Sequence, residues 1–321
     1  MTNKLILSPS KNLQTKIIAI AVLSIAVIAI SFAAIFIKWS EVELGANATT
    51  FNRFWIGTVI FLFWNSFNFV YLKLSNVRSN QESIKDNPYT KNVILLLLVL
   101  GFSALISQLL WVWSITQISI AISTIFHNLT PIFTTLSAWL VFNKHFEKKF
   151  LMGMAIAIVG IMIVSIQDIL QIASGKISGE IAALFSAVFY AVYLLIVEQL
   201  RTKLSATTLL MWSCLTGTIL ILPLLIVTGE QLFPHSWEGW LAVISLAFIC
   251  QFLGQGLIGY SLNKLSAGFV SLFLLIDPVM TAVEAWIIFS ENLSLLELIA
   301  FLLVLLGIYL ALSSQSSLHQ E

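Results

Sequence analysis

Charge is scarce in this chain. Asp, Glu, Lys and Arg make up 10% of its 321 residues, whereas hydrophobic residues make up 59%. An ordinary soluble domain carries about 25% charged residues, so this chain has too few ions to cover a globular surface. Its 16 Lys and Arg nearly balance its 15 Asp and Glu, which leaves no basic patch for nucleic acid. This composition argues against a soluble enzyme, a nucleic-acid binder and a disordered protein.

Cysteine is also rare. Cys214 and Cys250 both lie in apolar runs, without the paired framework of a disulfide protein or the Cys/His spacing of a metal site. We interpret them as small core hydrophobes and predict neither a metal nor a cofactor. The sequence carries no phosphate-binding loop and no nucleophile–base pair, so we predict that the protein is not an enzyme.

Long uncharged runs make up most of the sequence, and its mean hydropathy is +0.98. A helix that crosses a bilayer needs about 20 mostly apolar residues. The runs are continuous rather than alternating, which favours helices over membrane strands. We predict an all-α polytopic membrane protein with ten spans, at approximately 17–37, 51–72, 92–113, 119–142, 150–167, 178–197, 205–228, 239–260, 266–289 and 294–312.

Lysine and arginine concentrate on one side of these predicted spans. Thirteen of them lie before span 1 or in the loops after the even-numbered spans, while the opposite side has only Lys38 and Lys176. Cytoplasmic loops are enriched in Lys and Arg. The distribution predicts an even number of spans with both termini in the cytoplasm, and we expect an integral protein of the bacterial inner membrane.

The two halves of the chain repeat. Aligning Pro131 with Pro278 matches residues 114–165 to 261–312 without gaps, with ten identical positions. Because each half holds five spans, the second must enter the membrane from the opposite side, which makes an inverted repeat. We divide the chain into a cytoplasmic N-terminal segment (1–16), a first repeat of spans 1–5 (17–167), an external linker (168–177), a second repeat of spans 6–10 (178–312) and a cytoplasmic C-terminal tail (313–321).

Several motifs carry a resemblance to a known family. They are Arg53-Phe54 in span 2, Ala121 through Pro131 to Ala138-Trp139, Gly153 and Gly160, Ala267 through Pro278 to Trp286, Glu291 through Ser294, and Gly307-Ile308. With them the chain resembles the EamA-type members of the drug/metabolite transporter superfamily over about 17–312. It departs from that pattern at Lys144, where an acidic residue usually stands, and at Ala300, where a glycine is expected. The resemblance implies a secondary carrier of small metabolites, such as amino acids, nucleosides or drugs, that often works outward.

Polar residues recur on spans 4 and 9. A charge at the bilayer centre costs roughly 2.5–3.5 kcal/mol on insertion scales, so each ionisable group there is a candidate for function. Asp277, Thr281 and Glu284 share one face of span 9, and Pro278 is predicted to kink that helix. In span 4, Thr130 and Thr134 match Asp277 and Thr281, and the helix-kinking Pro131 matches Pro278. His127 extends the span 4 stripe one turn further and is a candidate as well. We predict that both stripes line one central cavity; the alternative is that the hydroxyls bond their own backbone and the carboxylates pair structurally.

Five further candidates lie on other spans: Arg53, Gln108, Trp111, Tyr190 and Gln255. Arg53 is either a partner for an anion or a residue of the membrane interface. Gln108 and Gln255 either bind substrate or join helices by hydrogen bonds. Trp111 and Tyr190 either form a wall for a ligand or belong to the aromatic belt at the membrane interface. Turning by about 100° per residue, Asn128 is expected to point away from the His127 stripe. Glu198 is expected to anchor a span end at the interface.

These features predict a transporter that moves a small metabolite by alternating access, with a channel or receptor-like protein as the alternative. We expect an exporter of amino acids, nucleosides, amines or drug-like compounds, with the lipid bilayer and a small-molecule substrate as its partners. Proton coupling is a hypothesis that rests on the titratable groups His127, Asp277 and Glu284. Gly153 and Gly307 mark close helix packing, either within one chain or between protomers, so the oligomeric state stays open.

Overall fold

The computed structural model describes residues 9–74, 88–118, 120–164, 177–289 and 295–317, and every regular element within them is helical. Residues 168–176 of the predicted linker (168–177), the motif from Glu291 to Ser294 and the chain ends lie outside these ranges. The helices are α1 (Pro9–Ser31), α2 (Ala33–Ser40), α3 (Ala46–Leu74), α4 (Lys91–Gln117), α5 (Ile120–His127), α6 (Thr130–Phe142), α7 (Lys148–Val164), α9 (Ile177–Leu200), α10 (Ala206–Thr228), α11 (Trp237–Ser245), the π-helix η1 (Leu246–Gln255), α12 (Gly256–Ser261), α13 (Ala267–Phe273), the short 3₁₀ helix η2 (Leu274–Ile276), α14 (Asp277–Phe289), α15 (Leu295–Leu312) and the short 3₁₀ helix η3 (Gln315–Ser317).

Seven helical segments among the described residues are long and apolar enough to cross a bilayer. They correspond to predicted spans 1–4 and 6–8. Predicted spans 9 and 10 are shorter apolar helices, Ala267–Thr281 and Leu298–Leu312, and predicted span 5 is the 17-residue α7. The protein is therefore an integral membrane protein with many spans, and the count of ten stays a prediction.

Local sequence sets several helix ends. The hydroxyls of Ser205, Ser236 and Ser266 each accept a hydrogen bond from a backbone N–H in the first turn of α10, α11 and α13, which satisfies donors that a helix leaves free. The helices α6 and α10 end at Asn143 and Gly229, whose φ angles are 52° and 65°. Asparagine and glycine are the residues that adopt this left-handed conformation most readily.

Three predicted spans are interrupted near their middle. Span 4 breaks between His127 and Thr130, and Pro131 is the second residue of α6. Span 9 passes through the 3₁₀ turn η2, and Pro278 is the second residue of α14. Because proline has no N–H, it fits the first turn of a helix, whose N–H groups have no intrahelical partner. Span 8 contains the ten-residue π-helix η1, an irregularity that is frequent at functional sites.

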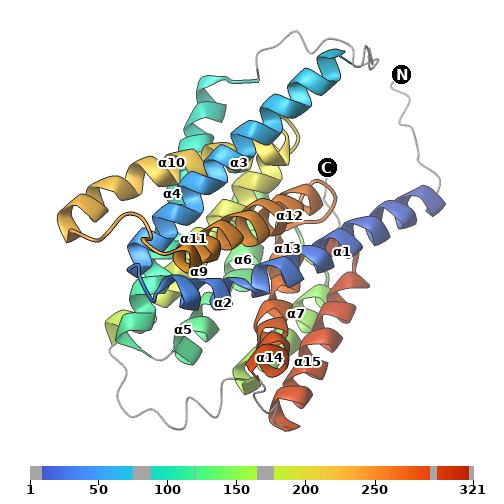
Figure 1. Cartoon of the computed structure of the whole chain (residues 1–321). Helices are drawn as coiled ribbons and strands as arrows, with labels where there is room; N and C mark the ends of the chain where they lie inside the picture. Colours follow the sequence, from blue (N-terminus) through green and yellow to red (C-terminus); the bar gives the residue numbers. More distant parts are fainter. Residues whose placement is uncertain (1–8, 75–87, 119, 165–176, 290–294, 318–321) are drawn as a thin grey trace.

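Helices from the two halves of the chain pack against each other throughout. The neighbours include α7 with α15, α3 with α10, α6 with α13, α4 with α9, and α1 with η1. The first of these pairs lies side by side in Figure 1. Replacing each span by its counterpart five spans away turns the neighbours 3 and 6 (α4–α9) into 8 and 1 (η1–α1), and it leaves the span pairs 2–7, 4–9 and 5–10 unchanged. A two-fold axis between the halves would produce this pattern of neighbours.

Candidate functional site

A cavity of about 360 Å³ lies between the two halves, and helices from both halves form its wall. Eleven of the thirteen residues that sequence analysis selects line it: Arg53, Gln108, Trp111, His127, Thr130, Pro131, Tyr190, Gln255, Asp277, Pro278 and Thr281. The breaks in spans 4 and 9 put Pro131 and Pro278 on this wall. The interrupted helices therefore lie beside the cavity, where free backbone groups have polar partners.

Two predicted site residues lie behind the wall. Thr134 is fully buried, and its hydroxyl lies 2.6 Å from Ser271 Oγ, which joins α6 to α13. Glu284 is 6% exposed and contacts Ser31 at the end of α1. Neither is among the lining residues, because α13 and α1 pack over these parts of the two stripes.

Arg53 is held by a chain of polar contacts. Its Nε donates to Gln251 Oε1 at 2.8 Å, and Gln251 Nε2 donates to Cys214 Sγ at 3.3 Å. The side chain is 8% exposed, and it forms no ion pair with any carboxylate of the described residues. It is therefore a fixed positive charge on the cavity wall. This excludes the prediction that Arg53 lies free at the membrane interface, and no direct bond joins it to Asp277 or Glu284.

His127 has its ring orientation fixed by α9. Its Nδ1 lies 2.8 Å from Ser186 Oγ, and that hydroxyl donates its proton to the carbonyl of Ala183 at 2.6 Å. A hydroxyl has one proton to donate, so with that proton on the Ala183 carbonyl the Ser186 oxygen accepts from Nδ1. Among the described residues no direct hydrogen bond joins His127 to Asp277, the two titratable groups of the coupling hypothesis that line the cavity.

Four rings continue along the same wall. The centroid distances are 5.9 Å from Trp111 to His127, 5.6 Å from His127 to Tyr190, and 5.7 Å from Tyr190 to Tyr193. The hydroxyl of Tyr193 donates to Gln255 Oε1 at 3.4 Å. Such a row gives a ligand both apolar contact and the negative faces of π-systems.

Three polar atoms of lining residues are buried without a hydrogen-bond partner: Trp111 Nε1, Asn128 Nδ2 and Asp277 Oδ1. Buried polar groups are nearly always satisfied by protein, water or ligand. The prediction that Asn128 points away from the site is wrong, because α5 ends at His127 and the constant turn of a helix no longer applies. Among the described residues, side chains of the cavity wall thus leave two donors and one carboxyl oxygen unsatisfied.

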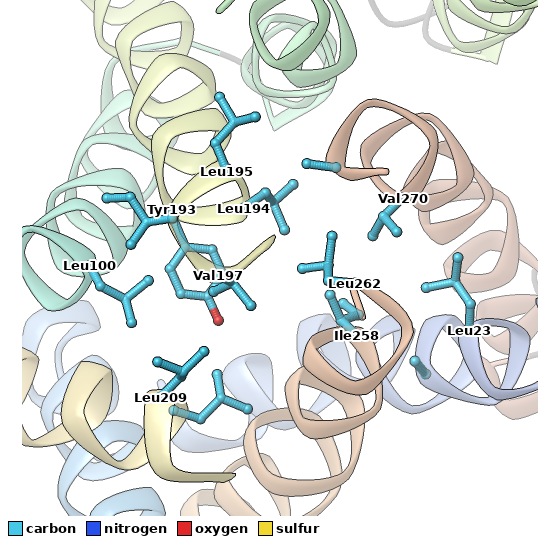
Figure 2. Close-up of a cluster of buried hydrophobic side chains, with 14 of the residues drawn as sticks. Leu23, Leu100, Tyr193, Leu194, Leu195, Val197, Leu209, Ile258, Leu262 and Val270 are labelled. Atoms are coloured by element: carbon cyan, nitrogen blue, oxygen red, sulfur yellow. The ribbon is translucent and has the colours of Figure 1, made fainter. Parts of the chain in front are cut away.

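A layer of buried apolar residues lies beyond one end of the cavity. Figure 2 shows side chains from α1, α4, α9, α10, α12 and α13 converging beside Tyr193, and those that it labels are 6% exposed or less. Along α9 this layer follows the cavity-lining Tyr193, and along α10 it precedes the cavity-lining Ser213. This apolar layer therefore lies toward the α9–α10 turn, on the side that the charge distribution predicts to be cytoplasmic.

An ion pair lies beyond this layer. Lys144 Nζ is 2.9 Å from Glu198 Oε1, with the side chains 16% and 4% exposed. It joins the segment after α6 to the end of α9, and so joins the two halves. The prediction that Glu198 anchors at the lipid interface is wrong, since its carboxylate is turned inward.

Sequence reasoning missed several hydroxyls on the wall: Ser31, Ser107, Ser213 and Ser271. Serine in a transmembrane helix commonly bonds its own backbone, so composition alone gives no reason to select them. Ser107 directly precedes the selected Gln108 and donates to the carbonyl of Ser186 at 2.8 Å. In the sequence, only its position next to Gln108 indicates that Ser107 belongs to the same site.

The comparisons with known proteins agree with this architecture. The model of the EamA-like transporter family matches residues 17–166 and again 177–313. The chain is 24% and 25% identical to proteins of Salmonella typhimurium and Escherichia coli that are each named "Probable amino-acid metabolite efflux pump". Each match covers 56% of this chain and 62% of the relative, so this chain aligns with less than two thirds of their length.

Two other similarities extend over most of the chain. A protein of Archaeoglobus fulgidus named "Uncharacterized transporter" is 22% identical, over 88% of this chain and 92% of its own. A crystal structure of another protein superposes with a TM-score of 0.72, at 15% identity, over 91% of this chain and 96% of that one. At that identity the superposition shows a shared fold.

Proposed function

Because the chain belongs to the EamA-like transporter family, a family of membrane transporters, we propose that it is a secondary carrier that exports small amino-acid-like metabolites. The observation that carries this proposal is one cavity with a buried guanidinium and a carboxylate that do not pair with each other. A zwitterion would neutralise both groups at once. The named efflux pumps of two bacteria support the same substrate class.

In this proposal each end of the substrate has its own partner. The Arg53 guanidinium binds a carboxylate, for which its planar fork of N–H donors is suited. Asp277 Oδ1, which has no hydrogen-bond partner among the described residues, accepts from an ammonium group. The row of rings from Trp111 to Tyr193 contacts the side chain. At about 360 Å³ the cavity is at the small end of the ligand-pocket range of roughly 300–1,000 Å³, which favours an amino acid over a large drug.

Transport then needs the cavity to reach each side of the membrane in turn. The closed apolar layer and the Lys144–Glu198 pair support a conformation that is sealed on the proposed cytoplasmic side. The inverted repeat supports the exchange, because each half can adopt the packing of its partner and so move the seal to the other end. We propose ten spans, cytoplasmic termini and a bacterial cytoplasmic membrane for the protein.

Counterflow in proteoliposomes tests this function. Vesicles holding the purified chain are loaded with unlabelled amino acids and diluted into a ¹⁴C-labelled amino-acid mixture. We expect rapid exchange of label, and inhibition by amino acids that exceeds inhibition by the matching amines or carboxylic acids. Asp277→Asn should abolish the advantage of the ammonium group, and Arg53→Gln that of the carboxylate. Exchange no faster than in empty vesicles would exclude amino acids as substrates.

A further inference from the structure

Glu284 lies behind Ser31, a residue that lines the cavity. Its Oε1 lies 2.5 Å from Ser31 Oγ, and its Oε2 is buried without a partner. No Lys, Arg or His of the described residues forms an ion pair with it. An ionised carboxylate at this depth would have one hydrogen bond and no counter-ion, which is a costly arrangement in a membrane. A substrate in the cavity does not reach Glu284 directly, since Ser31 and Thr281 line the wall and Glu284 does not.

Ser31 can serve both protonation states of this carboxyl group. Its hydroxyl has two acceptors within reach, Glu284 Oε1 at 2.5 Å and the carbonyl of Ile28 at 2.8 Å, but only one proton. When Glu284 is ionised, the hydroxyl donates to it. When Glu284 is protonated, the carboxylic acid donates to Ser31, and the hydroxyl turns to Ile28. One rotation of a hydroxyl therefore exchanges the two states without leaving a new unsatisfied donor.

The position of this contact links it to motion of the two halves. Ser31 is the last residue of α1, and the chain bends at Phe32 before α2 begins. The carbonyl of Ser31 also accepts from Thr281 Oγ1 at 3.4 Å. Both bonds tie the bend in the first half to α14 in the second half. A change of charge on Glu284 would alter the strength of this tie, because hydrogen bonds to ionised groups are roughly twice as strong as neutral ones.

The titratable groups near Glu284 lie on α14, η1, α3 and α1, and none of those described forms an ion pair with it. On α14 itself the titratable neighbour is Asp277, and on η1 it is Cys250; both interact electrostatically with Glu284. On α3, Arg53 interacts with Asp277 and Cys250 but does not pair with Glu284. On α1 the nearest titratable side chain is Lys16, fifteen residues or about 22 Å along the helix, and it donates to the carbonyl of Leu312.

We propose that Glu284, reached through Ser31, is the proton-binding site that couples transport to a pH gradient, and that Asp277 contacts substrate instead. This inference rests on the proposed carrier function, which supplies the transport to be coupled. Inward proton movement through Glu284 would drive export through the neighbouring cavity. In the repeat alignment Glu284 corresponds to Ser137, so the first half holds no matching carboxyl group.

Infrared difference spectroscopy on purified full-length protein tests proton binding without any substrate. The spectrum between acid and alkaline pH should contain a band of a protonated carboxyl group that Glu284→Gln removes and Glu284→Asp retains at a shifted frequency. Ser31→Ala should shift this band, since it removes the hydrogen-bond partner. The control Ser24→Ala, in which a serine of α1 that bonds only Ile20 is changed, should leave it in place. A difference spectrum that Glu284→Gln leaves unchanged would overturn the proposal, whatever the substrate is.

Proteoliposomes then test coupling, with the ¹⁴C-labelled amino-acid mixture as probe. We expect an imposed pH gradient to make wild-type vesicles accumulate label severalfold above equilibrium. Glu284→Gln should retain counterflow within about twofold but lose this accumulation, whereas Asp277→Asn should weaken counterflow itself. Accumulation by Glu284→Gln equal to that of wild type would refute the coupling role while counterflow kept the carrier function intact. Counterflow absent from wild type would refute the proposed substrate class, and the infrared result would still decide whether Glu284 binds the proton.

Discussion

Gly153 and Gly307 meet backbone to backbone where α7 crosses α15. A β-carbon on Gly153 would lie 2.4 Å from the carbonyl oxygen of Gly307, and one on Gly307 would lie 2.5 Å from the carbonyl oxygen of Gly153. The repeat alignment turns this pair into Ala300 and Gly160, and a β-carbon on Gly160 lies 3.0 Å from the Ala300 carbonyl oxygen. Close packing of the small residues is thus internal to the chain and reciprocal between the two helices.

Gly307→Ala should destabilise the protein. A methyl group there meets the backbone of α7, which can yield only if the helices separate, and overpacking of this kind costs about 1–3 kcal/mol. The melting temperature in detergent should fall. Gly256→Ala is the matched control, because a β-carbon at Gly256 has no neighbour within 4 Å. Equal melting temperatures for the two variants would contradict the close contact.

Breaking the pair between Lys144 and Glu198 should weaken the seal at the proposed cytoplasmic end. Lys144→Met leaves the carboxylate of Glu198, which is 4% exposed, without its cation. Removing one partner of a buried pair costs about 3–5 kcal/mol, and the partial exposure of Lys144 puts the expectation at the lower end. Melting curves of Lys144→Met, Glu198→Leu and the double variant measure this, and the double variant should lose less than the sum of the singles.

Lys148→Met is the control for this cycle. Lys148 is the exposed first residue of α7, so its removal changes the net charge equally without opening the seal. Strictly additive losses in the double variant would show that the two side chains do not stabilise each other.

Replacing Arg53 should weaken substrate binding selectively. Hydrogen bonds to charged groups contribute about 1.5–3 kcal/mol, so Arg53→Gln should raise the half-saturating amino-acid concentration in counterflow by about tenfold or more. The control is Lys73→Gln, since Lys73 is an exposed cation near the other end of the same helix. Wild-type affinity in Arg53→Gln would remove the arginine from the substrate site.

The loop before α3 should respond to acid through Glu43. Hydrogen bonds from the Ser236 hydroxyl and from the backbone N–H groups of Ser236 and His235 lower the pKa of this carboxyl group from its ordinary 4.5. A lowered pKa stabilises the fold above the ordinary value, and the effect is lost as pH falls through the lowered pKa.

Melting temperatures of wild type and Glu43→Gln should therefore differ most at neutral pH and converge on acidification below about 4.5. Glu41→Gln serves as the control, because Glu41 lies in the same loop with an exposed side chain. A difference between wild type and Glu43→Gln that does not change with pH would show that the hydrogen bonds do not depend on the charge.

The polar stripes of spans 4 and 9 show what the sequence can and cannot predict about the cavity. Spacing by seven residues correctly predicts that Asp277 and Glu284 share a face of one helix, since an α-helix turns by about 100° per residue. It does not predict that only Asp277 lines the cavity. That difference arises because Ser31 of α1, some 250 positions away in the chain, packs over Glu284. Long-range contacts of this kind leave no periodic signal.

Asn128 and Glu198 were misjudged for related reasons. The helical turn that would direct Asn128 away from the site stops at His127, where the chain leaves the helix before Pro131. Glu198 has the pattern of a span end, and only the fold brings Lys144 of the other half within 2.9 Å of it. In both cases a local rule was applied to a residue whose surroundings come from another segment.

The sequence by itself determined that this chain lies in a membrane, that its elements are helices, which family it belongs to, and which few polar side chains are costly to bury. Those properties follow from the hydrophobicity and hydrogen-bonding capacity of each residue in lipid, which the order of residues specifies locally. The tertiary structure alone decided that Arg53 and Asp277 line one cavity and that Glu284 lies behind it. These are relations between surfaces of different helices, and they exist only once the two halves have packed together.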